Sequence, residues 1–525
     1  MQVPPGALPY SKIAALCALA LIIFVFVVFL PPVYVLTYAF SSKLAIDAAA
    51  RTALINSFAI AAAVTFADLV FGMPVAWVLA RRQLRFRGII DSLLDMPLVV
   101  PTSVLGLSVY YFWGEGLGSL LGVEGGLFSK GPILIILLHV VFTFPYVVRS
   151  ISAAILQVDT AHEQAATMLG GSPFTVYRAV SLPLFKNGVF SGAILAFTRS
   201  LSETGATMMV AGAFLSAPVM VVAFKNGGDI PSAAALSVVL IASAVAVLIL
   251  AKLMVKGFKV PVVHVWPAQE KSLSRMHGPR DLAISAWVLI VVLLPTFYLV
   301  LTGMDTLTPG TFIGLLGDGV LIDSMVVSFV VGFVVTAVNL ALSIPLGLVV
   351  SKDMFRVGQA VDTMSDVILI VPTSALGLSL ALYWNGFGFG EYATLILAHL
   401  SFTFPLMLRP IVTALNGVSP QLEDAARTLG ARQLTVFRTV TYPLIKPAIM
   451  AGVIMTFMRS LSETGATLSI SKSIKTVPVL LVDQFSKGRV DEKTELACLL
   501  LFFISFALII ILKTFGSGKN AEHRG

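Results

Sequence analysis

The feature that most constrains this chain is a series of apolar runs, each close to the length needed to cross a lipid bilayer. A transmembrane helix needs about 20 mostly apolar residues in succession. Runs of this kind recur along the chain, for example at 13–30, 232–253, 282–301, 326–350 and 496–512. Only 12% of the 525 residues are charged, about half of the roughly 25% typical of soluble proteins. We therefore predict an all-α polytopic membrane protein.

The apolar pattern predicts twelve membrane-spanning helices, six in each half of the chain. Their expected ranges are 13–40, 52–80, 88–113, 132–157, 186–211, 232–256, 281–302, 322–350, 363–385, 392–414, 446–469 and 495–513. Lysine and arginine gather after the second, sixth, eighth and twelfth of these helices. Because cytoplasmic loops carry an excess of basic residues, we expect both termini to lie in the cytoplasm.

Charge and cysteine content exclude two other classes of protein. The formal net charge of +8 would suit a nucleic-acid-binding protein, but the apolar spans leave no soluble domain to hold a basic groove. The two cysteines, Cys17 and Cys498, each lie within an apolar run. They can form neither a disulfide framework nor a metal cluster, so we expect no metal site built on them.

The chain is a tandem duplication. Three segments occur twice and in the same order: PTSVLGLS at 101–108 and PTSALGLS at 372–379, FTFP at 142–145 and 402–405, and RSLSETGAT at 199–207 and 459–467. An even number of spans gives both repeats the same orientation, so their symmetry axis is expected along the membrane normal, with a pathway between them. We predict a first repeat at 1–262, a cytoplasmic linker at 263–280 and a second repeat at 281–525.

A loop after the fourth predicted helix of each half has an unusual composition. It reads EQAATMLGGSPFTVYRAVSLP at 163–183 and EDAARTLGARQLTVFRTVTYP at 423–443. Each copy begins with an acidic, alanine-rich stretch, which is followed by a glycine, an amphipathic stretch and a proline. This order predicts a short helix, a sharp turn that glycine permits, and a second piece that ends where proline can begin the next helix.

These two loops resemble the EAA loop of binding-protein-dependent permeases of ATP-binding-cassette (ABC) importers. In that family a glycine is followed, after nine residues, by an aliphatic residue, a variable residue and Leu-Pro. Val180 and Val440 take the aliphatic place, while Tyr442 stands where leucine is usual. We call the two copies the first and second EAA-like loops.

In the family, this loop forms the coupling helix that docks into a groove of the ATPase subunit. The resemblance therefore implies that role for Glu163, Ala165, Ala166, Gly170, Pro183, Glu423, Ala425, Ala426, Gly430 and Pro443. It also implies two copies of an ABC ATPase and an extracytoplasmic solute-binding protein as partners, in the cytoplasmic membrane of a prokaryote. The chain has no GxxxxGK[ST] phosphate-binding loop. We therefore expect no cofactor and no enzymatic activity in it, with ATP bound by the partner.

The RSLSETGAT segments place ionisable residues deep in the fifth helix of each half. Arg199 and Glu203 are four residues apart, as are Arg459 and Glu463, so each pair can form on one helix face. Ionisable residues inside a membrane usually face the bundle interior or water. The pairs are therefore either structural or part of the pathway or its gate. The candidate pathway residues are Arg199, Ser202, Glu203, Thr207, Arg459, Ser462, Glu463 and Thr467.

The same segment resembles that of molybdate and tungstate permeases and, more distantly, of sulfate permeases. Serine replaces the usual alanine at Ser200 and Ser460, and threonine replaces the aromatic residue at Thr204 and Thr464. The resemblance implies an inorganic oxyanion as the solute. Fusion of two halves in one chain instead resembles ferric-iron and thiamine permeases, which is the alternative.

Two other classes of membrane protein remain to be compared with the importer. A proton-coupled secondary transporter could use Glu203 and Glu463 as proton carriers, and co-purification of an ATPase would separate it from the importer. An intramembrane enzyme is disfavoured, because His139 and His399 are isolated on predicted helices without a second metal ligand nearby. We expect these two histidines to form hydrogen bonds between helices.

Overall fold

The computed structural model describes residues 8–41, 47–82, 85–116, 127–257, 269–270, 272, 277–471 and 473–517. Every regular element in this part of the chain is a helix. Nine of the described helices are long and apolar enough to cross a membrane, or eleven if two bent helix pairs each count as one span. The predicted all-α polytopic class is confirmed. Most of the predicted linker at 263–280, namely 263–268, 271 and 273–276, lies outside the described residues.

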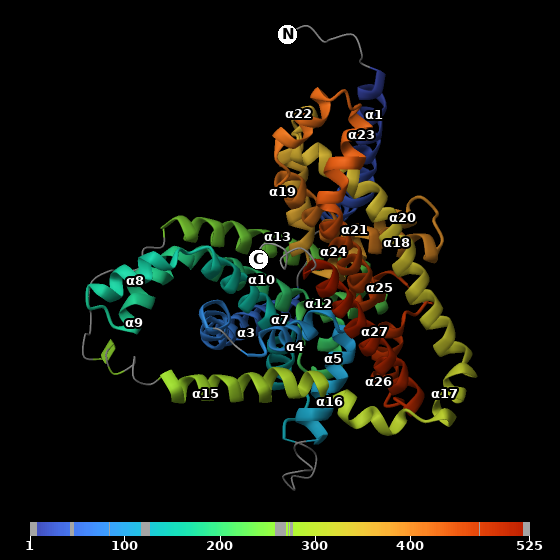
Figure 1. The fold of residues 1–525 in the computed structure, drawn as a ribbon. Helices are drawn as coiled ribbons and strands as arrows, with labels where there is room; N and C mark the ends of the chain where they lie inside the picture. The colour runs from blue at the N-terminus through green and yellow to red at the C-terminus, as the bar shows by residue number, and fades with distance from the viewer. Residues whose placement is uncertain are drawn as a thin grey trace. The chain divides into compact units, whose positions relative to one another are not determined.

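The helices form two compact units. Unit N comprises residues 47–220 and 239–307, and unit C comprises residues 1–46, 221–238 and 308–525. The helices α12 (Ala217–Asn226) and α13 (Ile230–Gly257) each contribute to both units. Figure 1 shows the ribbon with the helix labels used below.

The helices of unit N are α3 (Ala48–Arg81), α4 (Arg87–Val99), α5 (Thr102–Val109), η2 (Tyr110–Gly116), α7 (Pro132–Leu156), α8 (Thr160–Met168), α9 (Pro173–Val176), η3 (Tyr177–Ser181), α10 (Leu182–Ser202), α11 (Gly205–Val210), α15 (His277–Trp287), η4 (Val288–Leu293), α16 (Leu294–Thr302) and η5 (Gly303–Thr306). The three long helices α3, α7 and α10 pack against one another and form the centre of this unit.

The helices of unit C are α1 (Leu8–Ile23), η1 (Phe24–Phe29), α2 (Leu30–Ser41), α17 (Pro309–Leu316), α18 (Gly319–Ser351), η6 (Met354–Arg356), α19 (Gly358–Ile370), α20 (Thr373–Asn385), α21 (Glu391–Asn416), α22 (Pro420–Thr428), α23 (Gln433–Val436), η7 (Phe437–Thr441), α24 (Tyr442–Ser462), α25 (Gly465–Ile470), α26 (Val477–Ser486) and α27 (Glu492–Ser517). Here α18, α21 and α24 form the centre, as their counterparts do in unit N.

Each unit contains the first helix of the other half of the sequence. In unit C, the Cys17 thiol on α1 donates to the Pro345 carbonyl at 3.4 Å. The ring of Phe24 lies 5.2 Å from that of Phe404. In unit N, Trp287 stacks on Phe71 with ring centroids 3.9 Å apart. The compact units therefore group the helices differently from the predicted repeats, which are divisions of the sequence.

The third predicted span of each half is sharply bent. Helices α4 and α5 meet at 100°, and α19 and α20 meet at 112°. The bends fall at Val100–Pro101 and Val371–Pro372, where the residue before proline is extended. A proline disfavours the helical conformation of the residue before it. The continuous helices expected at 88–113 and 363–385 are therefore wrong at these two points.

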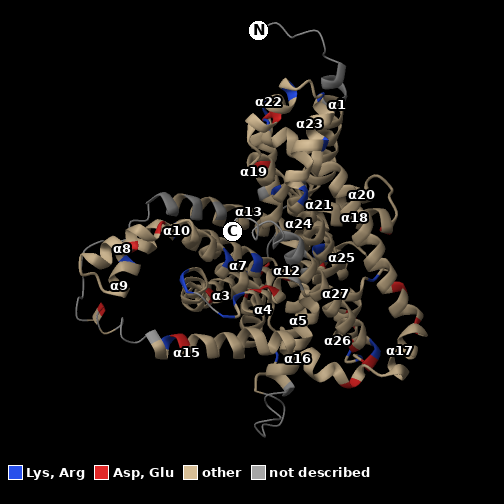
Figure 2. Ribbon diagram, viewed as in Figure 1, with Lys and Arg blue, Asp and Glu red and all other residues tan. Residues whose placement is uncertain are grey.

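The long helices carry few charged side chains along their lengths. Lysine, arginine, aspartate and glutamate gather instead near helix ends, for example at the start of α15 and in α22 (Figure 2). This distribution is the one that a bilayer requires, because a charge that faces lipid is costly.

Candidate functional site

The RSLSETGAT segment of unit N contains a break in the helix, which was not predicted. The helix α10 ends at Ser202 and α11 begins at Gly205, with Glu203 extended at φ −74° and ψ 131°. The continuous helices expected at 186–211 and 446–469 are wrong here, since unit C repeats the break between α24 and α25. The physical reason is that the glutamate side chain caps the second helix, as its contacts show.

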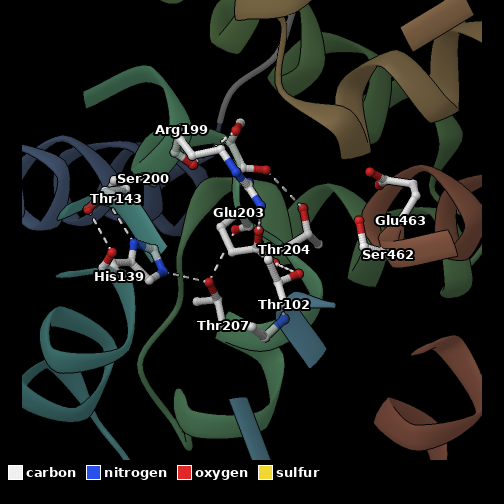
Figure 3. A network of polar contacts seen from close by, with 12 residues as sticks. Thr102, His139, Thr143, Arg199, Ser200, Glu203, Thr204, Thr207, Ser462 and Glu463 are labelled. Carbon is white, nitrogen blue, oxygen red and sulfur yellow. Dashed lines mark hydrogen bonds and ion pairs between the residues drawn. The ribbon is translucent and has the colours of Figure 1, made fainter. Parts of the chain in front are cut away.

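Glu203 connects three helices through its carboxylate. Its Oε2 atom pairs with Arg199 on α10 at 2.7 Å. Its Oε1 atom accepts from the Thr102 hydroxyl on α5 at 3.0 Å and from the backbone N–H of Ala206 on α11 at 3.2 Å. Only 5% of this side chain is exposed. The carboxylate therefore holds the break together (Figure 3).

Glu463 repeats two of these three contacts in unit C. Its Oε2 atom pairs with Arg459 at 2.6 Å, and its Oε1 atom accepts from the backbone N–H of Ala466 at 2.8 Å. The two predicted ion pairs are thus both present. Each arginine also lies over a ring of the FTFP segment: Arg199 is 4.9 Å from the centre of Phe142, and Arg459 is 5.3 Å from that of Phe402. Within each unit, two of the repeated segments therefore meet at the ion pair.

A buried histidine bridges the two sides of each break. His139 on α7 contacts the Ser200 hydroxyl through Nδ1 at 2.8 Å and the Thr207 hydroxyl through Nε2 at 2.9 Å. His399 on α21 makes the same contacts with Ser460 at 2.8 Å and Thr467 at 3.0 Å. The expected hydrogen bonds between helices are confirmed. Figure 3 shows the ring of His139 between its two partners.

The remaining hydroxyl candidates bond to nearby backbone. Ser202 donates to the Arg199 carbonyl at 3.0 Å, and Ser462 donates to the Arg459 carbonyl at 3.2 Å. The Thr207 hydroxyl also lies 3.2 Å from the Glu203 carbonyl. The eight candidate pathway residues therefore lie together as two groups of four, one at each helix break.

The PTS segments allow a close approach to these breaks. A Cβ atom added to Gly106 on α5 would lie 3.2 Å from the Cα atom of Ala206 on α11. In unit C, a Cβ atom on Gly377 would lie only 2.6 Å from the Cα atom of Ala466. A separation below 3.0 Å forces something to move. The second piece of the broken helix therefore packs directly on both glycines, and only at Gly377 is the approach too close for a Cβ atom unless the backbone shifts.

The EAA-like loops have the predicted local structure. In the first loop, the short helix α8 is followed by Gly170 at φ +88°, then by α9, η3 and α10, with Pro183 in the first turn of α10. In the second loop, α22 is followed by Gly430 at φ +86°, and Pro443 lies in the first turn of α24. This backbone conformation is left-handed, which glycine adopts at little cost.

The alanines of each loop close its turn. Leu169 and Gly171 donate their backbone N–H groups to the carbonyls of Ala165 and Ala166. In the second loop, the carbonyls of Ala425 and Ala426 accept equivalent bonds, from Leu429 and Ala431. A large apolar side chain is left at the tip of each loop: Leu169 is 90% exposed and Leu429 is 88% exposed.

The acidic residue at the head of each loop binds the C-terminal end of a long helix. Glu163 accepts from Arg81 at the end of α3 at 2.9 Å and from the Ser181 hydroxyl at 3.0 Å. Glu423 binds Lys352, just past the end of α18, at 3.1 Å, and accepts from the Thr441 hydroxyl at 2.9 Å. We call these two arrangements the loop clamps.

The electrostatics of the second loop clamp favour an ionised carboxylate. Burial would raise the pKa of Glu423, but the hydrogen bonds from Lys352 and Thr441 and the charges of Lys352 and Arg427 outweigh it and hold the pKa below its usual value. The partners of the two glutamates were not predicted from the sequence. A signal was available, because Arg81 and Lys352 occupy equivalent positions of the repeat, as do Ser181 and Thr441.

Comparison with known proteins gives a family for this arrangement. A family model described as the binding-protein-dependent transport system inner membrane component matches the chain twice, at residues 69–260 and 343–517. Both matches include an EAA-like loop and a helix break.

Three relatives are permease proteins of transport systems. The molybdate/tungstate transport system permease protein WtpB of Methanocaldococcus jannaschii is 29% identical over 39% of this chain and 82% of its own length. A probable sulfate transport system permease protein cysT of Helicosporidium sp. is 30% identical over 42% of this chain and 77% of its own length. The molybdenum transport system permease protein ModB of Mycobacterium bovis is 38% identical over 31% of this chain and 62% of its own length.

The family model covers more than half of the chain, and its two matches fall in the two halves of the duplication. The chain therefore belongs to the family of binding-protein-dependent transport system inner membrane components, as a permease in which two repeats are fused.

Proposed function

We propose that this permease is the membrane-embedded subunit of an ATP-driven importer and that it moves an inorganic oxyanion such as molybdate, tungstate or sulfate. The observation that carries the proposal is the pair of EAA-like loops. Each is a short helix that is clamped to a long helix at its acidic head and presents an exposed leucine at its tip. A loop built in this way can transmit a movement of a docked partner to the membrane helices, because the clamp keeps the loop rigid.

Two ATPase subunits dock on this permease, one on each EAA-like loop. An exposed apolar tip beside a rigid helix suits insertion into a groove of a partner, since burial of an apolar side chain drives association. ATP is bound by these partners, and the permease itself is neither an enzyme nor a cofactor carrier. An extracytoplasmic binding protein delivers the solute. The complex lies in the cytoplasmic membrane of a prokaryote, with both termini of the permease in the cytoplasm.

The helix breaks serve as the moving parts of the pathway. In each unit the ion pair, the bridging histidine and the capped helix end hold one arrangement of the break together. In this proposal Glu203 and Glu463 are structural anchors of a gate, and they carry no protons during transport. The contacts support this role, because each carboxylate binds an arginine and caps a backbone N–H group at the same time.

The proposed solute is supported by the relatives, whose names specify molybdate, tungstate, molybdenum or sulfate. Uptake in a bacterial strain that lacks its own carriers for these anions tests it. The permease, its ATPase and its binding protein should restore uptake of at least one of the three anions. Restored uptake of ferric iron or thiamine, without anion uptake, would refute the solute and favour the alternative that the fused repeats suggest.

A further inference from the structure

A second buried acid lies in unit N, outside the ion pair of the helix break. Asp68 lies within the long helix α3 and is fully buried, with 0% of its surface exposed. Its Oδ2 atom is 2.5 Å from the Thr143 hydroxyl on α7, and its Oδ1 atom has no hydrogen-bond partner. Within the described residues, Asp68 forms no ion pair with a lysine or an arginine.

The number of protons available to the contact between Asp68 and Thr143 indicates which of the two donates. The Thr143 hydroxyl lies 2.5 Å from Asp68 and also 2.7 Å from the His139 carbonyl, which only accepts hydrogen bonds. A threonine hydroxyl has one proton to donate. If Thr143 donates to the carbonyl, the proton in its contact with Asp68 must come from Asp68. If Asp68 were ionised, it would be a buried charge with one hydrogen bond and no counter-charge, which is costly inside a membrane.

The second repeat has the same geometry, with an uncharged residue in place of the aspartate. Asn339 occupies the position of Asp68, as Thr403 and His399 occupy those of Thr143 and His139. Its Nδ2 atom donates to the Thr403 hydroxyl at 2.7 Å, and that hydroxyl donates to the His399 carbonyl at 2.5 Å. Its Oδ1 atom has no partner, as in Asp68. An asparagine amide is a neutral donor, and a protonated aspartic acid presents its O–H group in the same place.

The arginines on the helices packed against α3 are engaged elsewhere. On α15, Arg280 binds Asp281. On α7, Arg149 binds Asp91 and Asp95. On α10, Arg199 binds Glu203, and both ring nitrogens of His139 are used by hydroxyl groups. None of these groups stands beside Asp68 as a counter-charge.

We propose that Asp68 keeps its proton and acts as a neutral hydrogen-bond donor, which positions Thr143 and, through α7, the histidine that bridges the helix break. It is a positioning residue equivalent to Asn339 and does not exchange protons during transport. Figure 3 shows Thr143 beside His139 at this bridge. The protonation state stands on the geometry alone, whereas its importance for uptake rests on the proposed function.

Infrared difference spectroscopy of the purified permease tests the protonation state. The spectrum of the wild type minus that of Asp68→Asn should contain the C=O band of one protonated carboxylic acid at neutral pH. Asn339→Asp is the matched variant, and it should add a second band of the same kind. Ionised carboxylate bands in the first difference spectrum would overturn the proposal, and so would their appearance in Asn339→Asp.

Stability and transport test the positioning role. Asp68→Asn should assemble with the wild-type yield and keep its uptake rate, while Asp68→Ala should lose yield because the donor is gone. Failure of Asp68→Asn to assemble, or assembly with loss of uptake, would contradict a neutral donor. If no variant and no wild type transports any oxyanion, the proposed function fails while the infrared and yield results still decide the protonation state.

A pair of threonine variants provides a control inside the same molecule. Thr143→Val and Thr403→Val remove the equivalent hydroxyl from an acid in one repeat and from an amide in the other. If Asp68 is neutral, both should lower the melting temperature by similar amounts. A much larger fall for Thr143→Val would show that the hydroxyl had been stabilising a charge, and the proposal would be wrong.

Discussion

Replacing Glu203 by glutamine should destabilise unit N by about 3 kcal/mol. The glutamine oxygen can still accept from Ala206 and Thr102, but its amide nitrogen cannot pair with Arg199. Removing one partner of a buried ion pair costs about 3–5 kcal/mol. We take the lower end because Arg199 keeps its contact with the Phe142 ring, worth about 0.5–1 kcal/mol. The remaining cost is that of an uncompensated guanidinium.

The assay is thermal melting of the purified permease in detergent. A loss of about 3 kcal/mol corresponds to a fall in Tm of roughly 6–12 °C for a cooperative unit of 150–250 residues. Glu463→Gln is the matched variant in unit C and should behave alike. Arg199→Gln combined with Glu203→Gln should recover much of the loss, since no charge is left unpaired.

The reversed pair, Arg199→Glu with Glu203→Arg, separates the contribution of charge pairing from that of capping α11. It restores opposite charges, but an arginine at 203 cannot accept the Ala206 N–H bond that caps α11. We therefore expect the reversed pair to remain well below the wild type in Tm. Wild-type melting of Glu203→Gln would refute the anchoring role and would be expected of a proton carrier that tolerates its neutral form. Full recovery by the reversed pair would refute the capping argument.

Three further predictions follow from the same structure. Gly430→Val forces a β-branched residue into the left-handed conformation at φ +86° and so should distort the turn of the second EAA-like loop. The purified complex should therefore hydrolyse ATP without solute uptake. Normal uptake coupled to ATP hydrolysis would contradict the docking assignment. Gly377→Ala should reduce folded yield more than Gly106→Ala, because its Cβ atom would meet backbone at 2.6 Å rather than 3.2 Å; equal yields would contradict the close packing. The pKa of Glu423 is lowered in the folded loop, chiefly by Lys352 and Thr441 against the effect of burial. Its contribution to stability is therefore full at neutral pH and is lost as pH falls through the lowered pKa. The rate of hydrogen exchange of α22 should rise as pH falls through the lowered pKa of Glu423. In Lys352→Gln this rise should occur at a higher pH. The same pH dependence in both proteins would contradict the clamp.

The sequence predicted the parts of this molecule that depend on local patterns. Apolar runs of bilayer length predicted twelve spans, and eleven of them coincide with candidate spans of the described residues if each bent pair counts as one. The glycine-centred loops were predicted down to the turn at Gly170 and the proline at the start of the next helix. The i,i+4 spacing predicted the ion pair of Arg199 with Glu203. These features are local because each is determined by residues close together in the chain.

The features that were missed depend on tertiary contacts. The break at Glu203 was not predicted, although polar residues surround it in the segment RSLSETGAT at 199–207. It depends on the cap that Glu203 gives to α11 and on the bridge from His139. The exchange of first helices between the halves was missed for a similar reason, because stacking of Trp287 on Phe71 leaves no local pattern.

The central claim is that ATP hydrolysis by docked partners drives an oxyanion through this permease. The most direct measurement is uptake of labelled molybdate, tungstate and sulfate into vesicles that contain the permease, its ATPase and its binding protein, with the proton gradient collapsed by an ionophore. We predict uptake that requires ATP, persists without the gradient and is lost in the double variant Gly170→Val with Gly430→Val. Uptake that stops on collapse of the gradient, although ATP is present, would contradict the account.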